Sequence, residues 1–286
     1  MIKTTAQKIY LGLIFIFLYA PIVTLIVLSF NASKTRAKWG GFTTKWYAAL
    51  FQNEQIMQAL WNTLALAVLS ALIATFIGTI ACIAMQSMKR TSRTILMGIT
   101  NIPMLNADIV TGVSMCLLFV AFFSGWGSFA SWFNTLGLFR LPTHLTMGFG
   151  TLLIAHITFN IPYVILSVGP KLRQMDRNLV DAAMDLGCTW MQAFWKVIIP
   201  EIKPGIVSGA LTAFTMSIDD FVISYFTAGS SSSTLAMTIY GMTKKKVTPE
   251  INAISTLLFV TVLILLAVIN VREARQERRL AAEQRR

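Results

Sequence analysis

The stretch KLRQMDRNLVDAAMDLGCTWMQAFWKVIIPEIKPG occupies residues 171–205 and separates two long apolar segments. Its pattern predicts two short amphipathic helices on either side of a glycine. In the first helix Asp176 is a candidate N-cap, and one helical face follows the i, i+3, i+4, i+7 spacing with Leu179, Ala182, Ala183 and Leu186. Gly187 is expected to end this helix in the left-handed conformation, which glycine adopts without steric cost.

The second helix of the hairpin is predicted to begin at a capping box. Thr189 is followed three residues later by Gln192, so each side chain can bond the other residue's backbone N–H. Pro200 is expected to end the helix. One apolar stripe is predicted from the helical spacing of Trp190, Phe194, Val197 and Ile198.

An amphipathic hairpin of this kind has two possible locations. It can lie in the headgroup layer of a membrane, or it can dock onto a partner protein. The pair Ala182 and Ala183 allows close backbone approach, and anionic lipid would repel Asp181 and Asp185. These features favour docking onto a protein.

The composition points to a chain that lies mostly in lipid. Of the 286 residues, 55% are hydrophobic and only 13% are charged, whereas soluble domains carry roughly 25% charged residues. A helix needs about 20 apolar residues to cross a bilayer, and several runs reach that length. We predict an all-α membrane protein with six transmembrane helices, at 9–30, 60–85, 95–122, 147–168, 205–228 and 251–271.

These spans predict the organisation of the chain. An N-terminal cytoplasmic segment and the first span occupy residues 1–30, an extracytoplasmic loop 31–59, and a core with five spans 60–271. The core includes the loop 171–203, and residues 272–286 form a basic tail. Sixteen of the 24 Lys and Arg residues lie on the side of the N-terminus, so both termini and this loop are expected in the cytoplasm.

The net charge of +12 has a membrane explanation, because excess Lys and Arg on cytoplasmic segments bind anionic lipid headgroups. No nucleic-acid partner is predicted. The three cysteines lack metal-ligand spacing, so neither a metal site nor a cofactor is expected. His144 is expected in an outer loop, and His156 is expected to be packed or hydrogen-bonded.

The segment DAAMDLG, nine further residues and VIIP resemble the EAA motif of permeases in binding-protein-dependent ABC importers. The matching positions are Asp181, Ala182, Ala183, Gly187, Val197, Ile199 and Pro200. The resemblance implies the MetI-like fold of type I importer permeases, with this loop seated in a cleft of an ATPase subunit. The chain has no GxxxxGK[ST] phosphate loop, so a separate polypeptide is expected to hydrolyse ATP and no enzymatic activity is predicted here.

Three acidic residues, Asp108, Asp219 and Asp220, fall within the predicted spans, which contain no Lys or Arg. At 1.5 Å per residue, Asp108 would lie about 21 Å and the pair about 23 Å from the cytoplasmic ends of their spans. A shared acidic layer suits a multivalent cation, and Tyr225 could add a cation–π contact. The alternative is that these carboxylates are structural, since neighbours about 100° apart on one helix cannot both face a pore unless the helix unwinds.

Four segments extend the resemblance to permeases of spermidine/putrescine importers. They are WGGFTTKWYAALFQN (39–53), LWNTLALAVLS (60–70), SIDDFVISYF (217–226) and KKVTPEINAISTLLF (245–259). The resemblance implies polyamine cargo, a second permease subunit, two ATPase copies and an extracytoplasmic polyamine-binding protein.

Three alternatives stay open at this point. The same machine could import another solute, such as an opine, a phosphonate or an iron complex. An autonomous channel would leave the EAA spacing unexplained. A membrane-embedded enzyme would need a catalytic constellation that the adjacent Asp219 and Asp220 do not form.

Overall fold

The computed structural model describes residues 5–33, 38–136, 141–176, 178–245 and 249–283. Within these ranges the chain is helical, apart from turns and one isolated β-bridge between Asn31 and Phe42. The elements are α1 (Thr5–Ser29), α2 (Lys45–Gln52), α3 (Glu54–Gln86), α4 (Arg90–Leu105), α5 (Asp108–Thr135), α6 (Phe149–Gln174), α7 (Asn178–Asp185), α8 (Trp190–Ala193), the π-helical turn η1 (Phe194–Ile198), α9 (Ile199–Asp219), α10 (Val222–Thr227), α11 (Leu235–Lys245) and α12 (Pro249–Glu283).

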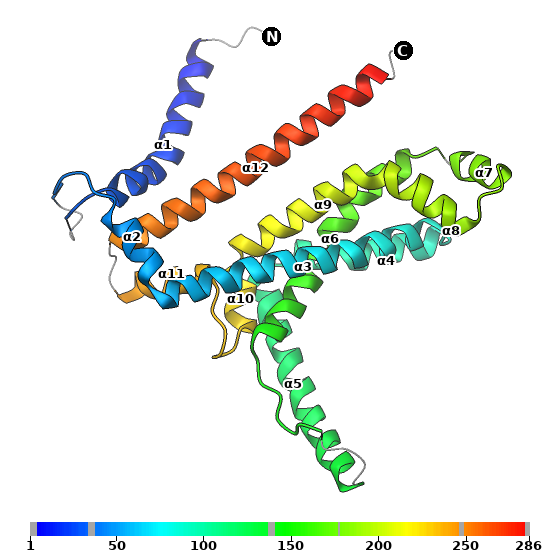
Figure 1. Cartoon of the computed structure of the whole chain (residues 1–286), viewed down its shortest axis with the longest axis horizontal. Helices are drawn as coiled ribbons and strands as arrows, with labels where there is room; N and C mark the ends of the chain where they lie inside the picture. The colour runs from blue at the N-terminus through cyan, green and yellow to red at the C-terminus, as the bar shows by residue number, and fades with distance from the viewer. Residues whose placement is uncertain (1–4, 34–37, 137–140, 177, 246–248, 284–286) are drawn as a thin grey trace. The chain divides into compact units, whose positions relative to one another are not determined.

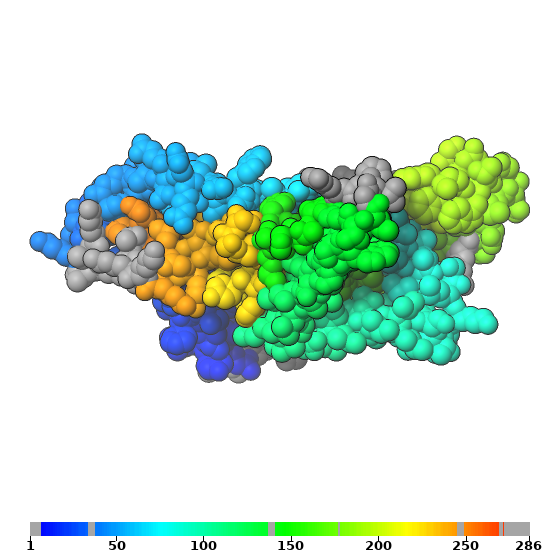
Figure 2. All heavy atoms as spheres, turned by 90° about the horizontal axis from the view of Figure 1, so that it is seen from below, coloured from blue at the N-terminus to red at the C-terminus, as the bar shows by residue number. Residues whose placement is uncertain are grey.

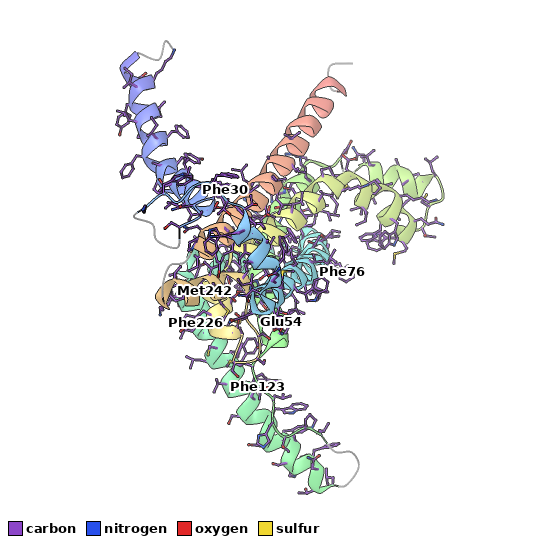
Figure 3. All side chains as sticks on the ribbon, turned by 60° about the vertical axis from the view of Figure 1, so that its left-hand side comes forward. Phe30, Glu54, Phe76, Phe123, Phe226 and Met242 are labelled. Atoms are coloured by element: carbon purple, nitrogen blue, oxygen red, sulfur yellow. The ribbon has the colours of Figure 1, made fainter. Side chains whose placement is uncertain are left out.

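Six helical segments in the described part of the chain are long and apolar enough to cross a membrane. They are Gln7–Ser29, Glu54–Gln86, Asp108–Thr135, Phe149–Gln174, Trp190–Asp219 and Pro249–Val268. The prediction of an all-α protein with six spans is therefore confirmed. Apolar side chains stand out on all sides of α1 and of the later turns of α5, as expected for surfaces that contact lipid (Figure 3).

The third span differs from the prediction of one helix over 95–122. The chain interrupts the helix at Asn106 and Ala107, both extended, and α5 begins at Asp108. Pro103 lies in the last turn of α4 and, lacking an N–H, removes one bond of the helical ladder there. Asp108 therefore lies at the start of a helix, and the depth estimated along one continuous helix does not apply to it.

The chain divides into two compact units, one formed by Met1–Leu60 with Thr238–Val268 and the other by Trp61–Met237 with Ile269–Arg286. In the first unit, buried Asn31 organises the segment between α1 and α2. Its Oδ1 accepts the backbone N–H groups of Ser33 and Gly40, and its carbonyl oxygen accepts a 2.7 Å bond from the Trp46 indole.

In the second unit, α6 and α9 pack against each other most extensively. A Cβ added at Gly205 would lie 2.9 Å from the Ser167 carbonyl oxygen, and one added at Gly209 would lie 3.2 Å from the Val164 Cα. Glycines four residues apart thus let the two backbones approach closely, as in many membrane helix pairs. Figure 1 shows the α7–α8 hairpin and α10 at opposite ends of α9.

Candidate functional site

The hairpin helix α7 is closed at both ends by local hydrogen bonds. The Asp176 Oδ1 accepts the Asn178 N–H at 3.0 Å, which confirms Asp176 as a cap. Gly187 has φ +86°, as predicted for a left-handed C-terminal cap. The N–H of Gly187 bonds the Met184 carbonyl at 2.9 Å and that of Cys188 bonds the Ala183 carbonyl at 3.0 Å, which is the Schellman pattern.

The second helix begins at the predicted capping box. The Thr189 N–H donates to Gln192 Oε1 at 3.0 Å, and the Gln192 N–H donates to Thr189 Oγ1 at 3.4 Å. The prediction that Pro200 ends this helix is wrong. The π turn η1 joins α8 to α9, and Pro200 lies in the first turn of α9, where a missing N–H is tolerated.

The hairpin leaves large apolar side chains uncovered by the described part of the chain. Leu186 is 87% exposed, Trp195 60% and Trp190 55%. Figure 2 shows the hairpin residues, in yellow-green, standing out at one end of the view. Of the EAA positions, Asp181, Ala182, Gly187 and Pro200 are exposed, and Ala183, Val197 and Ile199 are half-buried.

The prediction of one span over 205–228 is wrong, because α9 ends at Asp219 and α10 begins at Val222. The break between α9 and α10 separates the two adjacent acids. Asp219 is the last residue of α9, is exposed, and makes no side-chain hydrogen bond or ion pair with the described residues. Asp220 is extended, with φ −67° and ψ 124°, and its side chain is only 9% exposed. The helix is therefore interrupted at the acidic pair, so the angle of about 100° between neighbours on one continuous helix does not apply to these two acids.

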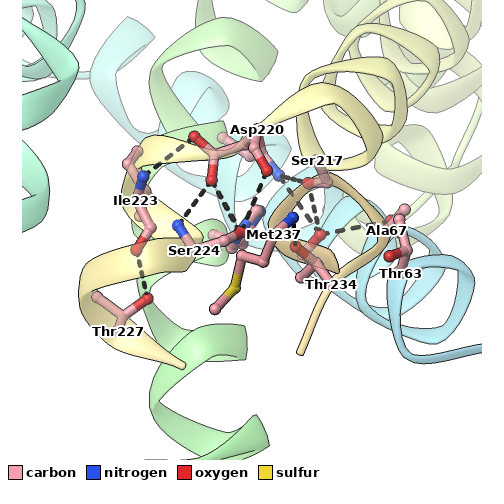
Figure 4. A network of polar contacts seen from close by, with 12 residues as sticks. Thr63, Ala67, Ser217, Asp220, Ile223, Ser224, Thr227, Thr234 and Met237 are labelled. Carbon is pink, nitrogen blue, oxygen red and sulfur yellow. Dashed lines mark hydrogen bonds and ion pairs between the residues drawn. The ribbon is translucent and has the colours of Figure 1, made fainter. Parts of the chain in front are cut away.

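Asp220 caps α10 with both carboxylate oxygens. Its Oδ1 accepts the Ile223 N–H at 3.3 Å, and its Oδ2 accepts the Ser224 N–H at 2.8 Å and the Ser224 hydroxyl at 2.9 Å (Figure 4). These three hydrogen bonds tie the Asp220 side chain to the first turn of α10. The Asp220 carboxylate is thus bonded to the first turn of α10, while Asp219 is exposed.

His156 on α6 completes this polar cluster and is only 1% exposed, which confirms the prediction of a hydrogen-bonded histidine. Its Nε2 lies 3.0 Å from Ser224 Oγ and 3.5 Å from Asp220 Oδ2. Both partners approach the same ring nitrogen, and Ser224 is fully buried. This geometry is not that of a hydrolytic triad, in which the acid binds the other nitrogen.

A second buried polar cluster lies at the end of α9. The Asn160 Nδ2 donates to Ser217 Oγ at 2.7 Å, and the hydroxyls of Ser70 and Ser217 are 2.9 Å apart. These two clusters include four residues that were not predicted from the sequence: Asn160, Ser70, Ser217 and Ser224. A usable signal was present for two of them, because Ser224 follows Asp220 and Asn160 follows His156 at the i, i+4 spacing of one helical face.

The predicted pathway residues on α5 and α10 lie on packed, neighbouring helices. A Cβ at Gly112 would lie 3.4 Å from the Val222 carbonyl oxygen and 2.9 Å from the Phe226 ring, so the two helices nearly touch there. Asp108, one turn before Gly112, is exposed, and Tyr225 is 53% exposed. Asp108, Asp219 and Tyr225 therefore remain accessible, whereas Asp220 does not.

A hollow of about 200 Å³ flanks the break between α4 and α5. It is lined by Ile102, Pro103, Asn106, Thr111, Ser114, Met115 and Leu118. Among the described residues, no group of three or more His, Cys, Asp or Glu could hold a metal ion.

Comparison with known proteins decides the family of the chain. Residues 74–282 match the family described as "Binding-protein-dependent transport system inner membrane component". The chain belongs to this family. The permease is 36% identical to the "Spermidine/putrescine transport system permease protein PotC" of Escherichia coli (strain K12), over 90% of this chain and 89% of that protein. It is also 36% identical to the "Putrescine transport system permease protein PotI" of the same strain, over 90% of this chain and 87% of that protein.

Solved structures agree with the fold of the permease. A chain of a bacterial alginate ABC transporter, in complex with an alginate-bound periplasmic protein, matches with a TM-score of 0.67 at 18% identity, covering 94% and 93% of the two chains. A chain of the MetNI methionine ABC transporter matches with a TM-score of 0.56 at 20% identity, covering 78% and 98%. The family match and the relatives, which are transport permeases and not enzymes, make this chain a multi-pass membrane subunit of a binding-protein-dependent transport system.

Proposed function

We propose that this permease translocates polyamines such as spermidine or putrescine. The observation that carries the proposal is Asp219, an exposed carboxylate at the end of a membrane-length helix that has no partner among the described residues. An ionised side chain within the bilayer costs about 2.5–3.5 kcal/mol on insertion scales and therefore marks a pathway or a partner. A polyamine ammonium would satisfy this charge.

Two further exposed groups fit a cationic cargo. Asp108 begins α5, whose early turns contact α10, and Tyr225 presents a ring on α10. A ring face attracts an ammonium, worth about 0.5–1 kcal/mol at exposed sites. The similarity to PotC and PotI supports the same cargo class. Transport of an opine, a phosphonate or an iron complex by the same machine is the alternative.

The proposed partners follow from the hairpin and from the relatives. We infer a PotB-like second permease subunit, a PotA-like ATPase dimer and an extracytoplasmic PotD-like polyamine-binding protein. The exposed Trp190, Trp195 and Leu186 supply an apolar surface for the ATPase, framed by the EAA positions. This assignment places the hairpin and both termini in the cytoplasm, in agreement with the excess of Lys and Arg on that side.

The helix path from the hairpin to Asp219 suggests how ATP hydrolysis moves the cargo. Trp190–Asp219 is one continuous helical segment, which at 1.5 Å per residue spans about 45 Å. A shift of the hairpin on ATPase closure is transmitted along this segment to the break beside Asp219. Closure would open the cavity outward, and hydrolysis would reverse the motion.

Matched substitutions of the two neighbouring acids test the cargo assignment. Asp219→Asn, Asp220→Asn and the double variant are compared for polyamine uptake, normalised to permease level in the membrane. We expect Asp219→Asn to reduce uptake, because it removes the charge that attracts the cation. The permease level should stay normal, because the side chain is exposed. Unchanged uptake in all three variants at normal levels would show that the acids do not form a cation pathway.

A further inference from the structure

The buried His156 is not part of the exposed surface on which cargo recognition is proposed, although its Nε2 lies 3.5 Å from Asp220 Oδ2. Among the described residues, its polar contacts at the α9–α10 break are with Ser224 and Asp220. The chain contains two histidines, and the other, His144, is exposed. Because His156 is buried, any effect of this side chain on the proposed cation pathway must pass through the residues that it contacts.

The hydrogen-bond inventory at Ser224 assigns the direction of each bond. A hydroxyl has one proton to donate. The Ser224 hydroxyl lies 2.9 Å from Asp220 Oδ2, a carboxylate that can only accept, so the proton is directed there. The Ser224 Oγ then accepts from His156 Nε2–H at 3.0 Å. This chain of donors runs from α6 through α10 to the break.

The break matters for the accessibility of Asp219. In a continuous helix, Val222 and Ile223 would lie at i+3 and i+4 from Asp219, on the same face. In the structure, Asp220 is extended, α10 begins anew at Val222, and Ile223 is buried. The interruption therefore keeps two apolar side chains off the carboxylate of Asp219.

We propose that His156 is a positioning residue of the cation pathway. By donating to Ser224 it directs the serine hydroxyl onto Asp220, stabilises the cap of α10, and holds the break that leaves Asp219 exposed. Without this donor, the Ser224 hydroxyl can turn to the Asp220 carbonyl oxygen, 3.3 Å away in the same turn, and Asp220 loses one of its donors. One part of this inference rests on the proposed function, namely that Asp219 binds the cationic cargo.

Cysteine accessibility tests the positioning role independently of transport. Asp219→Cys is introduced after Cys82, Cys116 and Cys188 are replaced by alanine, and the assembled importer in membranes is treated with a membrane-impermeant thiol reagent. We expect His156→Leu to slow labelling of position 219 about fivefold, a change of the size expected for loss of one buried hydrogen bond. His156→Gln, which retains an N–H donor, is expected to restore labelling.

The control is His144→Leu, the same substitution at the other histidine, which is expected to leave labelling unchanged. Equal labelling in His156→Leu and His144→Leu would overturn the proposal. If His156→Leu fails to reach the membrane, Ser224→Ala replaces it, since it removes only the hydroxyl, and the same slowing is expected.

A double-mutant cycle on uptake separates positioning from general packing. If His156 acts through Asp220, the losses from His156→Leu and Asp220→Asn do not add in the double variant. Additive losses would contradict the proposal. The failure of this proposal can be told apart from the failure of the proposed function. If His156→Leu slows labelling while Asp219→Asn takes up polyamine normally, His156 positions the break but Asp219 is not part of a polyamine pathway.

Discussion

The α7–α8 hairpin and the α9–α10 break both interrupt a helical path, yet they differ in what they expose. The hairpin satisfies its polar caps locally and leaves Leu186 and two tryptophans uncovered. The break does the reverse, since it buries a polar cluster around Asp220 and leaves the carboxylate of Asp219 uncovered.

The difference indicates two kinds of partner at the two ends of α9. An exposed apolar patch marks a site of interaction, where a partner protein covers the patch and removes it from water. An exposed carboxylate within a membrane-length helical segment is stabilised by a cation or by a second polar surface. A permease that couples an ATPase to a cationic cargo needs one interface of each kind.

The largest expected effect is on the hairpin, through its left-handed turn. Gly187→Val should reduce uptake more than about tenfold, because a β-branched residue does not tolerate φ +86°. Gly187→Asn should retain part of the activity, since asparagine tolerates this conformation. Uptake and co-purification of the ATPase are measured together, and full activity in a correctly inserted Gly187→Val variant would argue against a coupling role.

The next effect is on the helix pair that connects the two regions. Gly209→Leu should destabilise the permease by about 1–3 kcal/mol, because the added side chain meets the Val164 backbone at 3.2 Å or less. Gly98→Leu is the matched control, since no atom lies within 4 Å of a Cβ added there. Thermal unfolding in detergent compares the two, and equal stability would contradict the close packing of α6 and α9.

A smaller effect is expected at the break. Asp220→Asn should lower stability by about 1–2 kcal/mol, because the amide NH2 that replaces one carboxylate oxygen cannot accept from the N–H donors of α10. Asp219→Asn should leave stability within about 0.5 kcal/mol, as for other exposed positions. Thermal unfolding of the two isosteric variants measures the difference, and the reverse order would show that the roles of the two acids are exchanged.

The smallest change in stability is expected at the exposed tip of the hairpin. Leu186→Ala should alter the free energy of unfolding by less than about 0.5 kcal/mol, since this leucine is 87% exposed. It should nevertheless weaken binding of the ATPase in a pull-down. A large loss of stability with normal ATPase binding would indicate that the leucine packs within the permease.

Local sequence signals were sufficient for the number of spans and for the caps of the hairpin, but not for the breaks within the third and fifth predicted spans. Long apolar runs allow few alternatives to membrane helices, and Gly187 and Thr189 set their own caps through neighbouring atoms. Pro200 was mispredicted because a π turn changes the hydrogen-bond register before it, and no residue pattern announces that turn.

The candidate site was only partly predictable. The acids were recognisable because charges are rare in apolar spans, but their separate roles depend on contacts between distant segments. His156 and Ser224 are 68 residues apart, and Ser70 and Ser217 are 147 apart. Pairings of this kind come from helix packing, which a single sequence does not specify.

Reconstitution into proteoliposomes with the ATPase, the second permease subunit and the polyamine-loaded binding protein tests the central claim most directly. The account predicts ATP-dependent accumulation of spermidine or putrescine, which Gly187→Val abolishes and Asp219→Asn reduces. Polyamine uptake that persists without the ATPase, or no uptake by the complete assembly, would contradict it.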